Sequence, residues 1–548
     1  MNEFKPRIFS VLKNYTWQQF LKDLISGIIV AVIALPLSIA FGIASGVTPE
    51  QGLYTAIFGG FMVSLLGGSR IQIGGPTGAF MMVVLGVIAG FGFDGLIIAT
   101  IMAGIIMIGF GLLKLGSLIK FIPFPLVTGF TSGIAMIIFS SQINDFFGLG
   151  MTDIPAKFFP KWWAYITNFK NINFTTTLIG IISLLIIIFW PKLKYVKKIP
   201  ATLIALVVAT LIVNLFSLDS VATIGSTFGK LSTSIPIPTI PAVTFERVVA
   251  LIPNAFVIAF LSAMVALLSA VVSDRMIEDT HNSNVELMAQ GAANITSAVF
   301  TGIPVTGGLA RTVANLRNGA RTPIAGIIHS IVLLLFLVSL TPLIQLVPLS
   351  AFAAILFVAA YNMSEWRRFV SLFKAPKSDT LILVATFFFA IGVSLISAIG
   401  VGLALSMLLF MKRMSEVSTV ESLEFAENMN SETLVLEKDL KDIATYKING
   451  PFFFGTAYKF TNAIKQIQPN IKYLIIEMKD VPAIDATAMQ SLKLAIQKCQ
   501  SKGITILISK LNEQPKKALT KALFIDLIGS DKIFNTFEEA YAFAKTNL

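Results

Sequence analysis

Charged residues, cysteine and histidine are all scarce in this sequence. Only 13% of the 548 residues are charged, whereas 55% are hydrophobic and the mean hydropathy is +0.80. A soluble chain of this length needs more charge to cover its surface, so a lipid bilayer is the expected solvent. The single cysteine, Cys499, excludes an internal disulfide, and with only His281 and His329 beside it a Cys/His metal site is excluded as well. No cofactor is expected.

Long apolar runs recur along the chain. Leu24–Phe41, Leu96–Leu113 and Leu251–Val272 are each long enough to cross a hydrocarbon core of about 30 Å. The first run has no small-residue cleavage site, which favours a span over a removable signal. We predict an α-helical polytopic membrane protein with about fourteen spans. They lie near residues 24–46, 51–67, 73–90, 95–115, 122–141, 174–190, 200–216, 248–273, 286–302, 305–318, 321–341, 345–361, 378–396 and 399–414.

The net charge of +12 is spread in short clusters between the apolar runs, which argues against nucleic acid and for encoded membrane orientation. If the N-terminus is cytoplasmic, the short outside connections offer Glu50 and Asp94 and almost no cations. Both termini are therefore predicted to lie in the cytoplasm, and the protein in a bacterial inner membrane. The inside connections then carry Arg70, Lys114, Lys120, Lys192, Lys194, Lys197, Lys198, Arg275, Arg317, Arg321, Arg367, Arg368, Lys374, Lys377, Lys412 and Arg413.

The composition divides the chain into four parts: a cytoplasmic N-terminal segment (1–23), a transmembrane domain (24–414), a linker (415–432) and a soluble domain (433–548). In the last part short apolar runs alternate with helical patterns, which indicates an α/β domain. It has no P-loop, nucleophile elbow or histidine, and we expect no enzymatic activity. The predicted strands are Ala444–Ile448, Lys472–Met478 and Ile504–Ser509, and the predicted helices are Ala457–Gln468, Thr487–Lys502 and Glu513–Ile525.

Two segments at membrane depth are too rich in glycine and proline to form continuous helices. They are RIQIGGPTGAF (Arg70–Phe80) and, seven spans later, TGIPVTGGLAR (Thr301–Arg311). Interrupted segments at corresponding places in two halves are typical of inverted-repeat transporters with a site at the bilayer midplane. The alternative is a pair of kinked helices in which glycine only permits close packing.

If Gly74–Gly78 and Thr306–Ala310 each end an extended piece and begin a half-helix, two helix N-termini face each other. Their free N–H groups and positive dipole ends attract an anion. Arg311 adds a fixed charge and paired donors for oxyanions. Its alternative role is to snorkel or cap a helix toward the inner face, together with Arg317 and Arg321.

Two other spans are candidates for walls of the site. In the eighth span a stripe of small residues lines either a cavity or a helix–helix seam, and the residues leave both open. In the first span Pro36 is expected to bend the helix. Phe41 is placed to cover the site, although a single phenylalanine on an apolar helix usually faces lipid or the core. The stripe consists of Ser262, Ala266, Ser269 and Ser273.

The chain resembles the SulP family of sulfate permeases, which is solute carrier 26-like, over essentially its whole length. The opening signature is matched by ALPLSIAFGIASGVTPEQGLYTAIFGG (Ala34–Gly60) and GGPTGAF (Gly74–Phe80). The similarity to bacterial members of the family lies in VSDRMIEDTHNSNVELMAQGAANI (Val272–Ile295) and TGIPVTGGLARTVANLRNGARTPIAGIIH (Thr301–His329). The resemblance implies a seven-plus-seven inverted repeat in core and gate domains, elevator-type alternating access, a C-terminal STAS domain and a homodimer. It also implies small anions as substrates, such as sulfate, bicarbonate, chloride, oxalate or C4-dicarboxylates.

Carried over by position, the family's substrate site falls on four spans. In many bacterial relatives the eighth span has a carboxylate associated with cation coupling, and Val265 stands there. Asp274 is nine residues further on, or about 13 Å along a helix, which is too far to replace such a carboxylate. No acid lies within Leu251–Ser273. An uncoupled exchanger or channel-like member is therefore the alternative to a coupled transporter. The implied substrate-binding residues are Leu37, Phe41, Thr77, Ala79, Phe80, Ser269, Gly307, Gly308, Leu309, Ala310 and Arg311.

In the tail, Leu474–Leu492 resembles the STAS core, and Thr487 stands where related anti-sigma-factor antagonists are phosphorylated. The simpler interpretation is that its hydroxyl helps to cap the helix after Asp485. A cytoplasmic protein partner of this domain is a further expectation. Two other function classes fit the sequence less well. Fourteen spans are excessive for a membrane-anchored sensor, and the nucleobase-carrier family lacks a STAS tail and uses acids that are missing here.

Overall fold

The computed structural model describes residues 4–117, 122–155, 157–193, 199–422, 442–467 and 470–548, in two compact units, 1–403 and 404–548. Lys120, Lys194, Lys197 and Lys198, and the part of the predicted linker from residue 423, lie outside the described residues.

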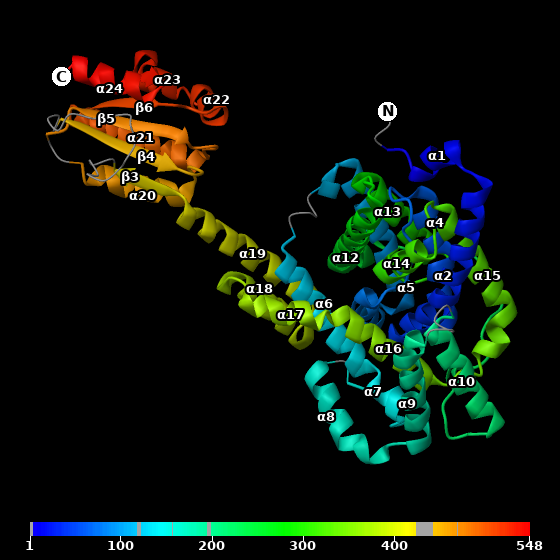
Figure 1. Ribbon diagram of the computed structural model, residues 1–548. Helices are drawn as coiled ribbons and strands as arrows, with labels where there is room; N and C mark the ends of the chain where they lie inside the picture. The colour runs from blue at the N-terminus through cyan, green and yellow to red at the C-terminus, as the bar shows by residue number, and fades with distance from the viewer. Residues whose placement is uncertain (1–3, 118–121, 156, 194–198, 423–441, 468–469) are drawn as a thin grey trace. The chain divides into compact units, whose positions relative to one another are not determined.

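The first unit is almost entirely helical (Figure 1). Eight helices in the described part of the chain are long and apolar enough to cross a membrane. Each of the fourteen predicted spans contains helix, while the number of crossings stays a prediction. The elements are α1 (Arg7–Val11), η1 (Leu12–Asn14), α2 (Trp17–Ala44), α3 (Pro49–Tyr54), the π-helical turn η2 (Thr55–Gly59), α4 (Gly60–Leu66), β1 (Gly74–Gly75), η3 (Gly78–Phe80), α5 (Met81–Leu112), α6 (Phe124–Ser141), α7 (Ile143–Phe147), α8 (Phe158–Asn168), η5 (Phe169–Asn171), α9 (Phe174–Phe189), η6 (Trp190–Lys192), α10 (Ala201–Leu215), α11 (Ile224–Phe228), α12 (Phe245–Ile277), α13 (Ser283–Val299), β2 (Thr306–Gly307), α14 (Leu309–Arg317), α15 (Ile324–Ile344), α16 (Leu349–Ser364), α17 (Trp366–Ser371), η7 (Leu372–Lys374), α18 (Lys377–Gly392) and α19 (Leu395–Val417).

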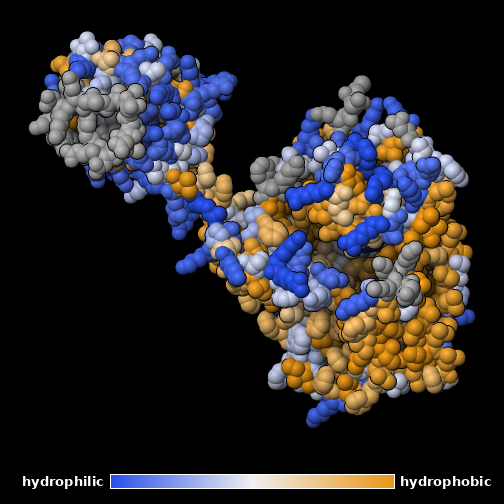
Figure 2. Space-filling view, in the orientation of Figure 1, coloured by the Kyte–Doolittle hydropathy of each residue, from blue (hydrophilic) through white to orange (hydrophobic). Residues whose placement is uncertain are grey.

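Large apolar side chains remain exposed on the long helices of this unit. Leu178 on α9, Leu211 on α10 and Leu335 on α15 are each more than half exposed. Figure 2 shows how such side chains cover much of one face of this unit, whereas the C-terminal unit is mostly hydrophilic outside. Apolar surface on this scale needs lipid as its solvent, as the composition predicted.

Two helix boundaries differ from a plain count of apolar residues. Helix α2 begins at Trp17, inside the segment predicted to precede the membrane domain, because the Thr16 hydroxyl accepts a hydrogen bond from the Gln19 N–H at 3.3 Å and caps the helix. Helix α5 covers two predicted spans, and its backbone is interrupted at Gly92, where φ is +71°. A left-handed glycine therefore supplies the turn predicted between residues 90 and 95.

The C-terminal unit holds a five-stranded sheet in the order β3-β4-β5-β6-β7, parallel except for the β3–β4 pair. Helices α20 and α21 pack on one face and α24 on the other (Figure 1). Because side chains alternate along a strand, Leu474 and Ile476 of β5 face the first layer and Ile475 the second. The elements are β3 (Thr419–Ser422), β4 (Ile443–Asn449), α20 (Phe454–Lys465), β5 (Tyr473–Asp480), α21 (Ala486–Ser501), β6 (Thr505–Ser509), α22 (Glu513–Lys521), α23 (Phe524–Ile528), η8 (Ser530–Lys532), β7 (Ile533–Phe534) and α24 (Phe537–Thr546).

The three predicted strands and three predicted helices of the tail are confirmed, apart from shifted ends and a last helix that divides into α22 and α23. Strand β3 lies within residues 415–432, which were predicted as a linker, and pairs with β4. The linker prediction is therefore wrong for residues 419–422. Their four-residue run is too short for an alternating pattern to reveal, and the backbone hydrogen bonds to β4 make it a strand.

Candidate functional site

The two interrupted segments meet in the structure as a short antiparallel pair. Gly74 lies opposite Gly307, and Gly75 lies opposite Thr306. The Gly308 N–H also donates to the Ile73 carbonyl at 2.9 Å. Both segments are extended at this point, so the prediction of extended pieces is confirmed and the alternative of two kinked helices is wrong.

A helix begins directly after each extended piece. The Phe80 N–H donates to the Thr77 carbonyl at 3.2 Å, and the Thr312 N–H donates to the Gly308 carbonyl at 2.9 Å, as the first bonds of η3 and α14. The N–H groups that precede these bonds have no helical partner, and they carry the positive end of the helix dipole. Helix α14 has only nine residues, or about 14 Å of rise, so it is a half-helix.

Buried polar side chains of α14 hold the first extended segment. The Asn315 amide donates to the Ile71 carbonyl at 3.0 Å, and the Thr312 hydroxyl accepts from the Ile73 N–H at 3.2 Å. The second segment is held in the same way from α13: Asn294 donates to the Val305 carbonyl at 2.8 Å and accepts its N–H at 3.0 Å. These bonds replace the backbone partners that an extended segment lacks inside a membrane.

Sequence reasoning missed these anchoring residues. Their signal is the presence of asparagine and threonine at membrane depth, since a polar side chain inside a membrane domain usually has a specific partner. The sequence does not indicate which backbone group each one meets.

Arg311 connects the two half-helices. Its side chain is only 4% exposed, and Nη2 donates to the Pro76 carbonyl of the first segment. Nη1 is buried and has no hydrogen-bond partner among the residues described. Gly75 leaves room for this group, because a Cβ there would lie 1.8 Å from Nη1. The snorkelling alternative is therefore wrong for Arg311. The end of α14 is capped instead by Arg321, which donates to the Leu316 carbonyl at 3.2 Å.

Two more members of the predicted set carry buried, unsatisfied hydroxyls. Thr77 Oγ1 and Ser269 Oγ have no partner in the described part of the chain. Buried polar groups without a partner are uncommon in folded proteins. Each of these hydroxyls, like Arg311 Nη1, would be satisfied by a bound anion or a water.

The remaining predicted residues differ in their surroundings. Phe41 lies against the start of the first half-helix, since a Cβ on Gly78 would be 3.2 Å from its ring, and Leu37 is half-buried one turn earlier. Ala79, Phe80, Gly307 and Gly308 are buried. Leu309 and Ala310 have exposed side chains, so their contribution to a site would come from the backbone N–H groups of the first helical turn.

The small-residue stripe on α12 serves mainly as a seam. The Ser262 hydroxyl donates to the Val305 carbonyl at 2.9 Å, the Ala266 carbonyl accepts from Gln72 at 2.8 Å, and Ser273 bonds its own helix. Only Ser269 keeps an uncommitted hydroxyl among the four. The stripe thus ties α12 to both interrupted segments.

A buried acid outside the predicted set has a structural role. The Glu286 carboxylate accepts the Gly68 and Ser69 N–H groups at 2.9 and 3.0 Å and the Gln290 amide at 2.8 Å. It fixes the chain after α4. Val265, which was predicted to stand at the position of a coupling acid, is half-buried against the apolar core.

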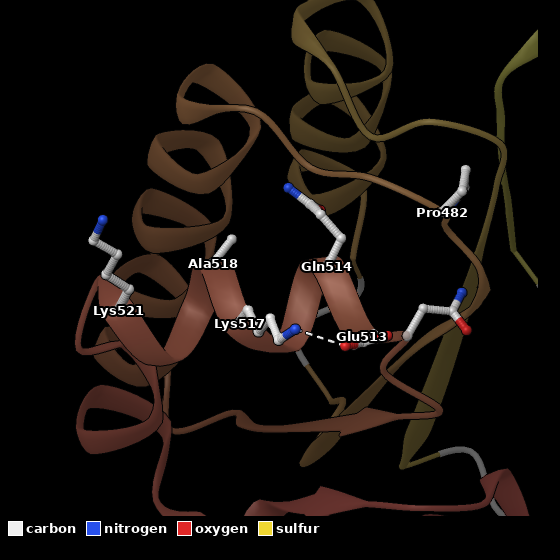
Figure 3. A pocket seen from close by; sticks show the side chains of 7 residues that line it. Pro482, Glu513, Gln514, Lys517, Ala518 and Lys521 are labelled. Carbon is white, nitrogen blue, oxygen red and sulfur yellow. Dashed lines mark hydrogen bonds and ion pairs between the residues drawn. The ribbon is translucent and has the colours of Figure 1, made fainter. Parts of the chain in front are cut away.

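In the C-terminal unit, the Asp485 carboxylate caps α21 by accepting the Ala488 N–H at 2.7 Å. Thr487 is exposed in the first turn, and its hydroxyl has no hydrogen bond to any described residue. The capping interpretation for Thr487 is therefore wrong, and its modification stays a prediction. A shallow groove beside α22 has a polar lining, with Lys517 and Glu513 paired at 2.6 Å (Figure 3). Its lining contains no serine, threonine, cysteine or histidine.

Comparison with known proteins gives two family matches. Residues 20–386 match the sulfate permease family, and residues 437–540 match the STAS domain. YvdB of Bacillus subtilis (strain 168) is 38% identical over 96% of this chain and 98% of its own length. The bicarbonate transporter BicA of Picosynechococcus sp. (strain PCC 7002) is 30% identical over 94% of this chain and 93% of its own.

The fold also matches a solved mammalian structure, that of the murine solute carrier 26 family member A9 anion transporter in the inward-facing state. The TM-score is 0.88, with 17% identity, over 99% of this chain and 94% of that one. At this identity the likeness concerns the fold alone.

Proposed function

Because the chain belongs to the sulfate permease family of membrane anion transporters, we propose that it carries a small anion held between the segments 74–80 and 306–311. Inorganic oxyanions and halides fit this proposal, with sulfate, bicarbonate and chloride first and C4-dicarboxylates next. Bicarbonate gains support from the BicA relative.

The observation that carries the proposal is the buried guanidinium of Arg311. It lies at the meeting point of two half-helix N-termini and keeps one nitrogen without a hydrogen-bond partner among the described residues. An unsatisfied cation beside two positive dipole ends is a strong local demand for an anion. Thr77 and Ser269 supply neutral hydrogen bonds, and Leu37 and Phe41 supply an apolar wall.

In this proposal the site moves as one body across the membrane, as in an elevator. The extended segments are bonded to each other and to α12, α13 and α14 by the asparagine and serine contacts described above. A site cross-linked in this way keeps its geometry while the body that contains it shifts against the other helices. We place both termini in the cytoplasm of a bacterial cell, with the chain acting as a homodimer.

Uncoupled exchange or uniport is favoured over cation coupling. Between residues 251 and 273 of α12 there is no acid, and the position of the coupling acid is Val265. The buried Glu286 does not substitute, since both its oxygens are committed to structural hydrogen bonds.

The test is a flux assay with the full chain in proteoliposomes, using labelled sulfate, bicarbonate, chloride and a C4-dicarboxylate, with uracil as a control substrate. We expect uptake of at least one anion, no uracil uptake, and no stimulation by a proton or sodium gradient. Uptake of uracil alone, or of no anion, would overturn the proposal. Stimulation by a cation gradient would overturn only the uncoupled mechanism.

A further inference from the structure

A second cavity, of about 460 Å³, is lined by residues outside the two paired segments. Its walls come from the first turns of α5, the end of α6, helix α8, the N-terminal part of α12 and the connection between α18 and α19. The polar side chains that line it are those of Ser140, Lys157, Lys161, Asn254 and Ser394.

Lys161 is the central charge of this cavity. It is only 8% exposed, and neither it nor Lys157 forms an ion pair with any acid in the described ranges. The cavity lining contains no carboxylate either. Burial lowers the pKa of Lys161, because no carboxylate offsets its lost hydration. A buried, unpaired ammonium is costly unless an anion accompanies it.

Helix α8 holds Lys161 in this position. Phe159, Trp163 and Ile166 are more than 60% exposed and lie on one side of the helix, as expected for a helix at a membrane surface. At the flank of this exposed side, the Trp162 indole donates to the Ser140 hydroxyl at 2.9 Å and fastens α8 to α6, while Lys161 lies on the opposite side. The lysine is therefore directed inward by a fixed helix.

The cavity adjoins the proposed anion site. Met82, which lines it, follows Phe80 of the first half-helix by two residues. With a cytoplasmic N-terminus, the lining parts of α5, α6, α12 and α18 all lie toward the outer surface. Its volume exceeds that of one small oxyanion and leaves room for several waters at about 30 Å³ each.

We infer that this cavity is an outer loading site, in which the Lys161 ammonium binds a small, partly hydrated oxyanion before it reaches the site at Arg311. The inference rests on the proposed transport function. The exposed Lys157, the residue just before α8 that also lines the cavity, adds a second charge that attracts anions from solution and favours dianions.

The test measures the half-saturating anion concentration separately from the outer and the cytoplasmic side of proteoliposomes. The variants are Lys161→Gln, Lys161→Arg and, as a control, Lys170→Gln, which removes an exposed lysine just beyond α8 that does not line the cavity. Removing a contact to a charged group should raise the external value about tenfold. We expect a higher external half-saturating concentration for Lys161→Gln only, with its cytoplasmic half-saturating concentration unchanged. Both concentrations should stay close to wild type in Lys161→Arg. No external change, or equal changes on both sides, would overturn the loading site.

A second readout does not depend on transport. A membrane-impermeant amine reagent is added outside to the wild-type chain, and modification of Lys161 is measured by mass spectrometry with sulfate, bicarbonate or gluconate present. Protection by sulfate or bicarbonate supports the outer site, even if no flux occurs and the proposed function fails. Protection by neither, while Lys170 reacts normally, overturns the outer site even if the chain transports. Because this readout uses the wild-type chain, it still tests the proposal if the Lys161→Gln variant does not fold.

Discussion

Replacing Gly75 with alanine should weaken anion binding without unfolding the protein. A Cβ at this position would lie 1.8 Å from Nη1 and 2.7 Å from Cζ of Arg311. Non-bonded heavy atoms prefer separations of about 3.5–4.0 Å, so the guanidinium must withdraw by about 2 Å. The obstructing atoms are the far end of a flexible side chain, and moving them costs the fold little.

The functional cost is larger than the structural one. A hydrogen bond to a charged group contributes about 1.5–3 kcal/mol, which corresponds to a Kd raised by about 10- to 150-fold. The assay is a calorimetric titration of the purified full chain with the transported anion, with the unfolding temperature measured beside it. Wild-type affinity in Gly75→Ala would refute the placement of Arg311 in the site.

Gly90→Ala is the matched control, because it lies in the half-helix that follows Gly75 and a Cβ there meets no atom within 4 Å. Its affinity should equal that of wild type. A double-mutant cycle adds a second criterion. In an Arg311→Ala background the Gly75 substitution has no guanidinium to displace, so it should cost almost nothing. An equal loss of anion affinity in both backgrounds would show that Gly75→Ala does not act by displacing the Arg311 guanidinium.

Three further predictions concern the scaffold and the tail. Asn294→Ala leaves the buried N–H of Val305 unpaired, while the Val305 carbonyl keeps its hydrogen bond from Ser262, so we expect about 1–3 kcal/mol of lost stability and slower flux; an unchanged unfolding temperature would contradict this. Cys499 is 2% exposed, and burial raises the pKa of its thiol, so a thiol reagent should label the folded chain slowly at neutral pH and faster as the pH rises and thiolate forms; rapid labelling of folded protein at pH 7 would be evidence against it. Asp485→Ala should lower the stability of the C-terminal unit by about 0.5–2 kcal/mol through loss of the cap, as seen in amide exchange, while Thr487→Ala should not; similar losses in both would assign the cap wrongly.

The interrupted segments could be predicted because glycine and proline restrict the backbone locally. Three glycines and a proline in Arg70–Phe80 exclude a continuous helix whatever surrounds them. Gly74 and Gly307 are far apart in the chain. Only the matching positions of their two segments in the two halves suggested that these segments lie close together. The direction of Arg311 depends on the pairing of these segments, so the residues alone left it open.

The anchoring contacts could not be predicted, since they depend on which helix faces are opposite each other. Asn294 and Asn315 could each have faced another helix, water or lipid. The same limit applied to the stripe on α12, where Ser262 and Ser269 are alike in sequence but differ in partners. Strand β3 was missed for a related reason, because only its pairing with β4 makes it a strand.

The central claim, that Arg311 holds the anion, is tested most directly by comparing Arg311→Ala with Arg317→Ala in an anion-binding titration of the full chain. Arg317 lies two turns along α14, is exposed, and controls for the loss of one positive charge. We predict that Arg311→Ala raises the Kd at least about tenfold, by loss of a charge-assisted contact, while Arg317→Ala leaves it near the wild-type value. Equal effects of the two substitutions would contradict the claim and remove Arg311 from the site.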